Sequence, residues 1–363
     1  MNSEIYFADP DKLLDFTRHI FLSAGFNDNK ATIAATVLQR ADLRGIDSHG
    51  VARLPGYVRL IKQGRILPDA ETAIVHETPG TALADGNKGI GLVIAGEAMD
   101  IAIEKARAVG SGWVAVKNSS HFGVAVAHAE KALKHNMIGF VLTNASPLVS
   151  PAGGITPLFG TNPVCVTIPA GKFPPVIIDM STTVAANGKL EIAQRKGGNI
   201  PEGWVQTREG LPSNNPDELK DGGTLLPLGG DLLHSSYKGY ALGGWVDIFS
   251  GVLSGANFGQ WVPPFVSFLD VHREEVGQGL GHFVGAWRID AFRPVEDFKT
   301  SMDIWIEHIK KSKPAPGVER VLIPGEPEAA HEATRMAKGI PLHPKVVEGL
   351  SELSKEYKVE LAI

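Results

Sequence analysis

Apolar residues recur at helical spacing along the first part of the chain. Residues 9–25 and 30–43 each show one apolar stripe that ends at a glycine. A third stripe follows over residues 48–64, where Asp47 or Ser48 is placed to cap the helix. The pattern therefore predicts a helical lobe at the start of the chain.

Beyond residue 72 the pattern changes to short apolar runs, typical of strands, that alternate with helical segments. Predicted strands cover residues 113–117, 137–143, 164–168, 175–179, 282–289 and 320–323, and predicted helices cover 92–109, 124–135, 184–195, 237–252, 295–311 and 344–357, with one more ending at Lys338. This alternation predicts the α/β class.

The chain divides into three predicted parts. Residues 1–75 form the helical N-terminal lobe, and residues 76–310 form an α/β core that binds cofactor and substrate. A polar, turn-rich excursion interrupts the core at residues 197–231. Residues 311–363 are expected to pack back on the core and on the N-terminal lobe.

Composition excludes several classes of protein. The 363 residues are 43% hydrophobic and carry a formal charge of −5 without long runs of either sign, so nothing suggests a nucleic-acid or membrane partner. Cys165 is the single cysteine, which rules out an intrachain disulfide and fits a reducing compartment. The polar N-terminus does not resemble a signal peptide. We therefore expect a cytoplasmic protein.

The segment between the second and third helices carries the first candidate chemistry. His49 and Arg53 lie four residues apart near the start of a helix, so a proton-transfer group and a two-point carboxylate binder share one face. The positive end of the helix dipole attracts anions and helps to keep the imidazole neutral. The alternative is a capped turn with a solvated histidine and arginine.

Three further segments place polar groups at the ends of strands or the starts of helices. The turn at 118–123, which holds His121, and the turn at 144–147 follow neighbouring strands and are expected to line one crevice. Asp179 ends a strand just before Ser181, Thr182 and Thr183, where a helix begins. Lys238 lies near a helix start that suits a pyrophosphate. Helix capping or solvation explains each segment equally well.

The spacing of glycines and histidines argues against a Rossmann dinucleotide site and a zinc site. Gly89, Gly91 and Gly96 do not give the glycine pattern of a standard Rossmann turn. Two helical turns, about 10.5 Å, separate neighbours among His121, His128 and His135, which is too far for one zinc ion to bridge. We therefore expect no metal site.

Five motifs, taken together, resemble the type 2 malate/L-lactate dehydrogenase family in order and spacing. They are Arg44 to Arg53, Asn118 to Gly123, Phe159 to Pro163, Ile178 to Ser181 and Tyr237 to Gly239. The resemblance covers nearly the whole chain. It implies a mixed-sheet α/β/α core of the sulfolactate dehydrogenase-like type, which is not a Rossmann fold, and an NAD(P)-dependent oxidoreductase that interconverts a 2-hydroxy acid and a 2-oxo acid.

The resemblance also implies roles for individual residues. His49 matches the proton donor of some members and His121 the proton acceptor of others, so the choice between them stays open, while Asp179 is expected to orient the acid/base or a water. Arg53 would hold the substrate carboxylate, with Ser48 and Tyr57 nearby. The positions that match cofactor-binding residues are Ser146, Asp179, Met180, Ser181, Thr182, Thr183, Lys238, Gly325, Glu326 and Pro327.

The expected cofactor is NAD, with NADP as the alternative. His234-Ser235-Ser236 stands where the family pattern has a Gly-Gly pair, which leaves that preference open. The expected substrates are malate and oxaloacetate or lactate and pyruvate. The alternatives are a cyclic imino acid, a sugar-derived 2,3-diketo acid, ureidoglycolate, sulfolactate, or NAD binding without turnover. Members of this family are homodimers that share the active site between subunits, and we expect the same here.

Overall fold

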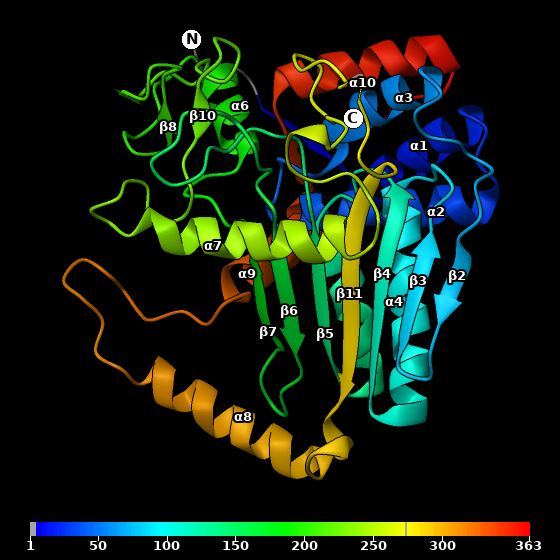
Figure 1. Cartoon of the computed structure of the whole chain (residues 1–363), viewed down its shortest axis with the longest axis vertical. Coiled ribbons are helices and arrows are strands. Elements are labelled where there is room, and N and C mark those ends of the chain that lie inside the picture. Colours follow the sequence, from blue (N-terminus) through cyan, green and yellow to red (C-terminus); the bar gives the residue numbers. More distant parts are fainter. Residues whose placement is uncertain (1–4, 273) are drawn as a thin grey trace.

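A seven-stranded mixed sheet forms the centre of the protein (Figure 1). The computed structural model describes residues 5–272 and 274–363. In sheet order the strands are β2 (Ala73–Glu77), β3 (Thr81–Asp85), β4 (Ser111–Ser119), β11 (Leu280–Arg288), β5 (Met137–Thr143), β6 (Val164–Ile168) and β7 (Val176–Met180). Strands β3 and β4 pair in parallel, and the other neighbours pair antiparallel. The predicted mixed α/β fold is confirmed, and this topology is not that of a Rossmann domain.

Helices cover both faces of the sheet. Helix α4 (Gly91–Val109) and the short α5 (Val126–Ala129) pack on one face, and α7 (Ser236–Asp247), continued by a π-turn at Ile248–Val252, crosses the other (Figure 1). Alternation along the strands explains the two layers, because Val114 and Val116 face α4 while Trp113 and Ala115 face α7. The sheet is therefore buried on both sides.

The N-terminal helices form a second apolar core at one end of the sheet. Helices α1 (Pro10–Ser23), α2 (Asp28–Leu43) and α3 (Leu54–Lys62) pack with α10 (Pro344–Tyr357) around Phe21, Leu38 and Tyr57. A short antiparallel pair, β1 (Tyr6–Ala8) with β12 (Ile340–Leu342), joins the two ends of the chain. Helix α9 (Glu326–Lys338) lies against α2.

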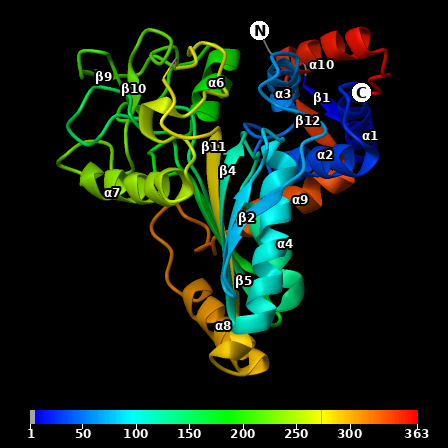
Figure 2. The same cartoon turned by 45° about the vertical axis from the view of Figure 1, so that its right-hand side comes forward.

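The polar excursion and the helical lobe lie at the same end of the sheet, on opposite sides of it (Figure 2). It contains a three-stranded sheet of β8 (Val205–Gln206), β9 (Pro212–Ser213) and β10 (Thr224–Leu225), and it is preceded by α6 (Asn187–Lys196). Helix α8 (Val295–Lys310) lies at the opposite end of the molecule. Among the described residues, no helix combines the length and the apolar character needed to cross a lipid bilayer.

Three local predictions are wrong. Residues 320–323 form no strand, and the predicted helix 124–135 is α5 followed by a 3-10 turn at Glu130–His135. Asp47 and Ser48 do not cap the third helix, which begins with a 3-10 turn at Val51–Arg53. Tertiary partners explain this last difference, since Asp47 pairs with Arg335 and Ser48 bonds to His49.

Candidate active site

The sheet brings the chemistry of three strands to one edge. Strands β4, β5 and β7 run in the same direction, because antiparallel strands separate them, so their last residues lie at the same edge. The turns after β4 and β5 carry His121 and Ser146. These two residues line one cavity, as the order of strands and turns predicts.

This cavity lies between α6 and residues 44–53 of the helical lobe, which we call the catalytic loop. Its volume is about 60 Å³. Its walls include His49, Arg53, His121, Ser146, Asn187 and Phe265. The rings of His49 and His121 stack, with centroids 5.7 Å apart and planes 19° from parallel. Two imidazoles and one guanidinium, the groups that proton transfer and carboxylate binding require, therefore share one small space.

The Tyr57 hydroxyl fixes the orientation of His121, because it lies 2.6 Å from Nδ1 of the ring. The backbone N–H of Gly123 lies farther away, at 3.4 Å from the same nitrogen. A hydroxyl both donates and accepts, so the contact with Tyr57 suits either tautomer of the neutral ring. Burial raises the pKa of Tyr57 well above its usual value, so this hydroxyl keeps its proton.

Both histidines are neutral near pH 7. Burial, and next the charge of Arg53, lower the pKa of His49 to about 3. Burial lowers the pKa of His121 well below its usual value, with His49 and Arg53 adding to the effect. A neutral imidazole can accept a proton from a hydroxyl group. An anion bound at Arg53 offsets one of the charges that depress these pKa values.

Arg53 is held by groups on two sides. Its Nε donates to the backbone carbonyl of Ser48 at 2.6 Å, and its terminal nitrogens lie 3.0 and 2.8 Å from the carboxylate of Glu191 on α6. The hydroxyl of Ser48 lies 2.8 Å from Nδ1 of His49. Ser48, Arg53 and Tyr57 are thus grouped with the histidines, as the sequence predicts.

Phe265 and Glu191 are site residues that the sequence did not single out. The Phe265 ring lies 4.5 Å from that of His121, and its backbone N–H donates to Oγ of Ser146 at 2.9 Å. Both residues are far from the histidine motifs along the chain. Their local sequence carries no catalytic signal, so only the fold reveals their position.

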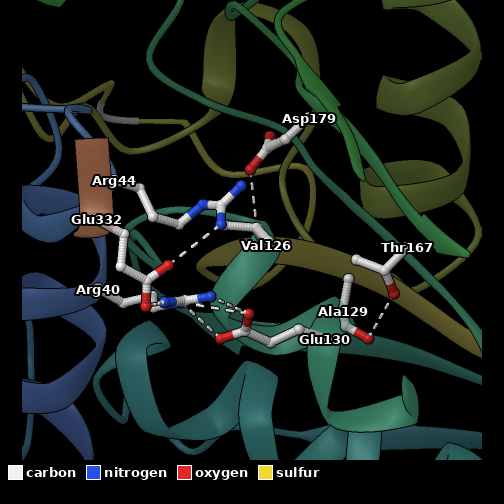
Figure 3. Close-up of polar contacts among 8 residues, drawn as sticks. All are labelled: Arg40, Arg44, Val126, Ala129, Glu130, Thr167, Asp179 and Glu332. Carbon is white, nitrogen blue, oxygen red and sulfur yellow. Dashed lines mark hydrogen bonds and ion pairs between the residues drawn. The ribbon is translucent and has the colours of Figure 1, made fainter. Parts of the chain in front are cut away.

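Asp179 lies elsewhere. It lines a separate cavity of about 390 Å³ that shares no wall residue with the histidine cavity. Its carboxylate accepts the N–H of Val126 at 2.9 Å and lies near Arg44 (Figure 3). Burial raises the pKa of Asp179 to about 6. Within this chain Asp179 contacts neither histidine, so its role in orienting the acid/base or a water stays a prediction.

The residues predicted to bind cofactor occupy three places. Met180, Gly325 and Pro327 line the Asp179 cavity, whereas Ser146 lies in the histidine cavity. Lys238 is exposed on α7. Ser181 and Thr183 form hydrogen bonds within the segment that links β7 to α6, whereas Thr182 donates to the carbonyl of Asn162, just before β6. Glu326 pairs with Lys310 and Arg320 at the start of α9. The single chain does not assemble these residues into one site.

A buried charge network supports the catalytic loop (Figure 3). Arg40 pairs with Glu130 at 2.7 Å and also with Glu332 of α9. Arg44, which is only 3% exposed, lies 3.6 Å from Glu332. The network ties α2, α9 and the turn after α5 together. The loop that starts at Arg44 is therefore anchored at its first residue.

Asp42 supports the same loop, and its ionisation predicts a pH-dependent stability. Its buried carboxyl accepts the N–H of Val51 at 2.7 Å, and burial raises its pKa from 3.8 to about 8. The unfolded chain loses this proton first as pH rises, so Asp42 costs about 1.4 kcal/mol of stability per pH unit between about 4 and 8. We expect Asp42→Asn to remove that slope.

The measurement is denaturant unfolding of wild type and Asp42→Asn at pH 5 and pH 8. The variant should gain stability relative to wild type as pH rises across this window. An equal difference at both pH values would show that Asp42 has no raised pKa. Asp28→Asn, at an exposed position at the start of α2, serves as the control.

A mixed α/β fold with a histidine–arginine cavity at the sheet edge suits an enzyme that oxidises small hydroxy acids. The family model for malate/L-lactate dehydrogenase matches residues 8–351. The chain belongs to this family and is a hydroxy acid dehydrogenase.

Named relatives and solved structures agree. The chain is 41% identical to a malate dehydrogenase of Pyrococcus horikoshii, over 96% of this chain and 95% of that one. It is 38% identical to an L-sulfolactate dehydrogenase of Methanothermobacter thermautotrophicus, over 98% of both. The fold matches malate dehydrogenase from Entamoeba histolytica with a TM-score of 0.93 at 33% identity, over 99% of this chain and 100% of that one. It also matches sulfolactate dehydrogenase from Methanocaldococcus jannaschii, with a TM-score of 0.87 at 34% identity over 98% of both.

Proposed function

We propose that the protein transfers hydride between NAD(H) and a small 2-hydroxy acid/2-oxo acid pair, either malate and oxaloacetate or lactate and pyruvate. The observation that carries this proposal is the pair of neutral, half-buried histidines that line one cavity together with Arg53. The similarity to malate dehydrogenases supports the choice of substrate.

The residues of the chain divide the chemistry between them. Arg53 binds the substrate carboxylate as a two-point fork and so fixes the position of the neighbouring C2 oxygen. During oxidation, His49 or His121 takes the hydroxyl proton, and during reduction the same group returns it. Nicotinamide, when bound, accepts or supplies the hydride.

The residues around the Asp179 cavity fit part of such a cofactor. The side chains of Ile178 and Met180 are 37% and 39% exposed and offer apolar surface to a flat ring. NADP is the alternative cofactor, because His234-Ser235-Ser236 departs from the Gly-Gly pair of the family pattern and so leaves the preference open.

The test is a panel of 2-oxo acids with NADH and with NADPH. We expect oxaloacetate or pyruvate to oxidise NADH, measured as a loss of the absorbance of the reduced nicotinamide. Sulfopyruvate and a cyclic imino acid belong in the panel, because relatives include L-sulfolactate dehydrogenases and a pyrroline/piperideine-carboxylate reductase. Binding of NADH without turnover on any substrate would instead mean a non-catalytic binding protein. The cytoplasmic location stays a sequence-based prediction.

We also propose that two copies of the chain share the active site. The separation of the predicted cofactor residues into three places supports this, because a second chain could complete each part. Exposed apolar side chains gather on α7 and its flanks, including Leu233 at 92%, Tyr237 at 53% and Ile248 at 54%. We expect a mass in solution of twice 38.7 kDa by light scattering. A monomer at the assay concentration would contradict the shared site.

A further inference from the structure

Helix α6 closes directly on the catalytic loop. A Cβ at Gly188 would lie 2.1 Å from Cβ of Ser48, so only glycine permits this approach of the two backbones. Apart from Gly188, Leu190 is the buried residue of the helix. The helix is thus held by few apolar contacts, and the polar contact that it makes with the catalytic loop is the pair between Glu191 and Arg53.

Glu191 occupies the part of Arg53 that a substrate would use. Both terminal nitrogens of the guanidinium face the two oxygens of this carboxylate, at 3.0 and 2.8 Å. The Nε–H is bound to the Ser48 carbonyl. A guanidinium offers a carboxylate its best geometry through two parallel N–H groups. A substrate carboxylate can take that position only after Glu191 leaves it.

Besides Arg53, Glu191 accepts a hydrogen bond from Nδ2 of Asn187 at 2.9 Å. A further, positively charged candidate partner lies one turn along α6. Arg195 is four residues C-terminal to Glu191 and half-buried, and within residues 5–272 and 274–363 it makes no hydrogen bond or ion pair. Glutamate followed by arginine at this spacing forms a favourable pair on a helix surface. Burial lowers the pKa of Arg195, and the nearby carboxylates of Glu191 and Asp47 oppose this shift. The guanidinium of Arg195 therefore lies near both carboxylates.

We propose that Glu191 exchanges partners during substrate binding: the substrate carboxylate takes the fork of Arg53, and Glu191 turns to Arg195. The exchange rests on the proposed function, because it requires a carboxylate substrate at Arg53. Glu191 is then a positioning residue that sets substrate affinity. It fills the fork when the site is empty and competes with every substrate for it.

The competition predicts opposite effects for the two ends of the exchange. Glu191→Gln removes the competing charge and keeps the shape of the side chain, so carboxylate affinity should rise. Arg195→Gln removes the second partner, so a displaced Glu191 has nowhere favourable to go and affinity should fall. The two effects are coupled, since Arg195 acts only through Glu191.

The experiment measures the dissociation constant of oxalate, a non-reacting dicarboxylate, by calorimetry, together with the KM and kcat for oxaloacetate and pyruvate. We expect Glu191→Gln to lower the dissociation constant and KM about fivefold, and Arg195→Gln to raise both about threefold. Arg195→Gln should change neither constant in the Glu191→Gln background. Lys196→Gln, which removes the adjacent exposed charge of α6, is the matched control and should resemble wild type.

Each other result overturns the exchange. A higher dissociation constant in Glu191→Gln would show that Glu191 holds Arg53 ready for substrate rather than competing for it. An equal effect of Arg195→Gln in both backgrounds would show that Arg195 does not act through Glu191. Absence of oxalate binding in both wild type and Glu191→Gln would show that Arg53 is not the carboxylate site. Loss of turnover on the whole panel while oxalate follows the expected pattern would reject the proposed function alone.

Discussion

Replacement of His49 or His121 by asparagine is expected to lower kcat for 2-oxo acid reduction by about 10² to 10⁴. Both imidazoles line the same cavity, with ring centroids 5.7 Å apart, so each lies beside a substrate bound there. Asparagine keeps the approximate size and polarity of the side chain. The loss should therefore come from proton transfer or orientation rather than from a collapsed cavity.

The pH dependence separates the two histidines. The variant that lacks the proton-transfer group should lose the titrating limb of the kcat profile, whereas the other variant should keep the limb at a lower rate. His19→Asn, an exposed position on α1, is the control. If both folded variants retained full reductase activity, the assignment of the acid/base to this pair would be wrong.

Replacement of Arg53 by glutamine is expected to raise the KM for oxaloacetate or pyruvate roughly a hundredfold, with a smaller fall in kcat. The physical reason is the loss of a charge-assisted, two-point hydrogen bond to the substrate carboxylate. Arg53→Lys keeps the charge but not the fork, so its KM should lie between those of wild type and Arg53→Gln.

Steady-state kinetics on the purified variants measures this effect. Lys62→Gln removes a positive charge from the exposed end of the same helix and should leave KM unchanged. An unchanged KM in Arg53→Gln would place the substrate carboxylate elsewhere, for example near Arg65, which lines a neighbouring cavity of about 510 Å³ together with His121.

Much of the fold follows from local patterns. The predicted helix 344–357 coincides with α10, and the predicted strands at 137–143 and 164–168 coincide with β5 and β6. These segments have a clear apolar period and clear ends. The pair of three-residue strands, β1 and β12, has no period to detect, and it forms because the two ends of the chain meet.

The site was predictable where its residues follow strands or share a motif. Ser48, His49, Arg53 and Tyr57 belong to one local run. His121 and Ser146 lie in the turns after two strands that run in the same direction with β11 between them, so both turns reach the same edge of the sheet. Asp179 also ends a strand at this edge. Strand β7 lies two strands from β5 in the sheet, so Asp179 lines a different cavity. The end of a strand can be predicted from sequence, but the distance between two strands in the sheet cannot.

By itself, the sequence determined the α/β class, the two histidines, the arginine four residues from His49, and the family likeness that joins them. These features depend on apolar period and on motif spacing, which are local properties of the chain. Only the tertiary structure decided that Glu191 fills the fork of Arg53, 138 residues away, and that Tyr57 fixes the orientation of His121. The reason is physical: burial and partner choice depend on which distant segments meet, and no local pattern encodes that meeting.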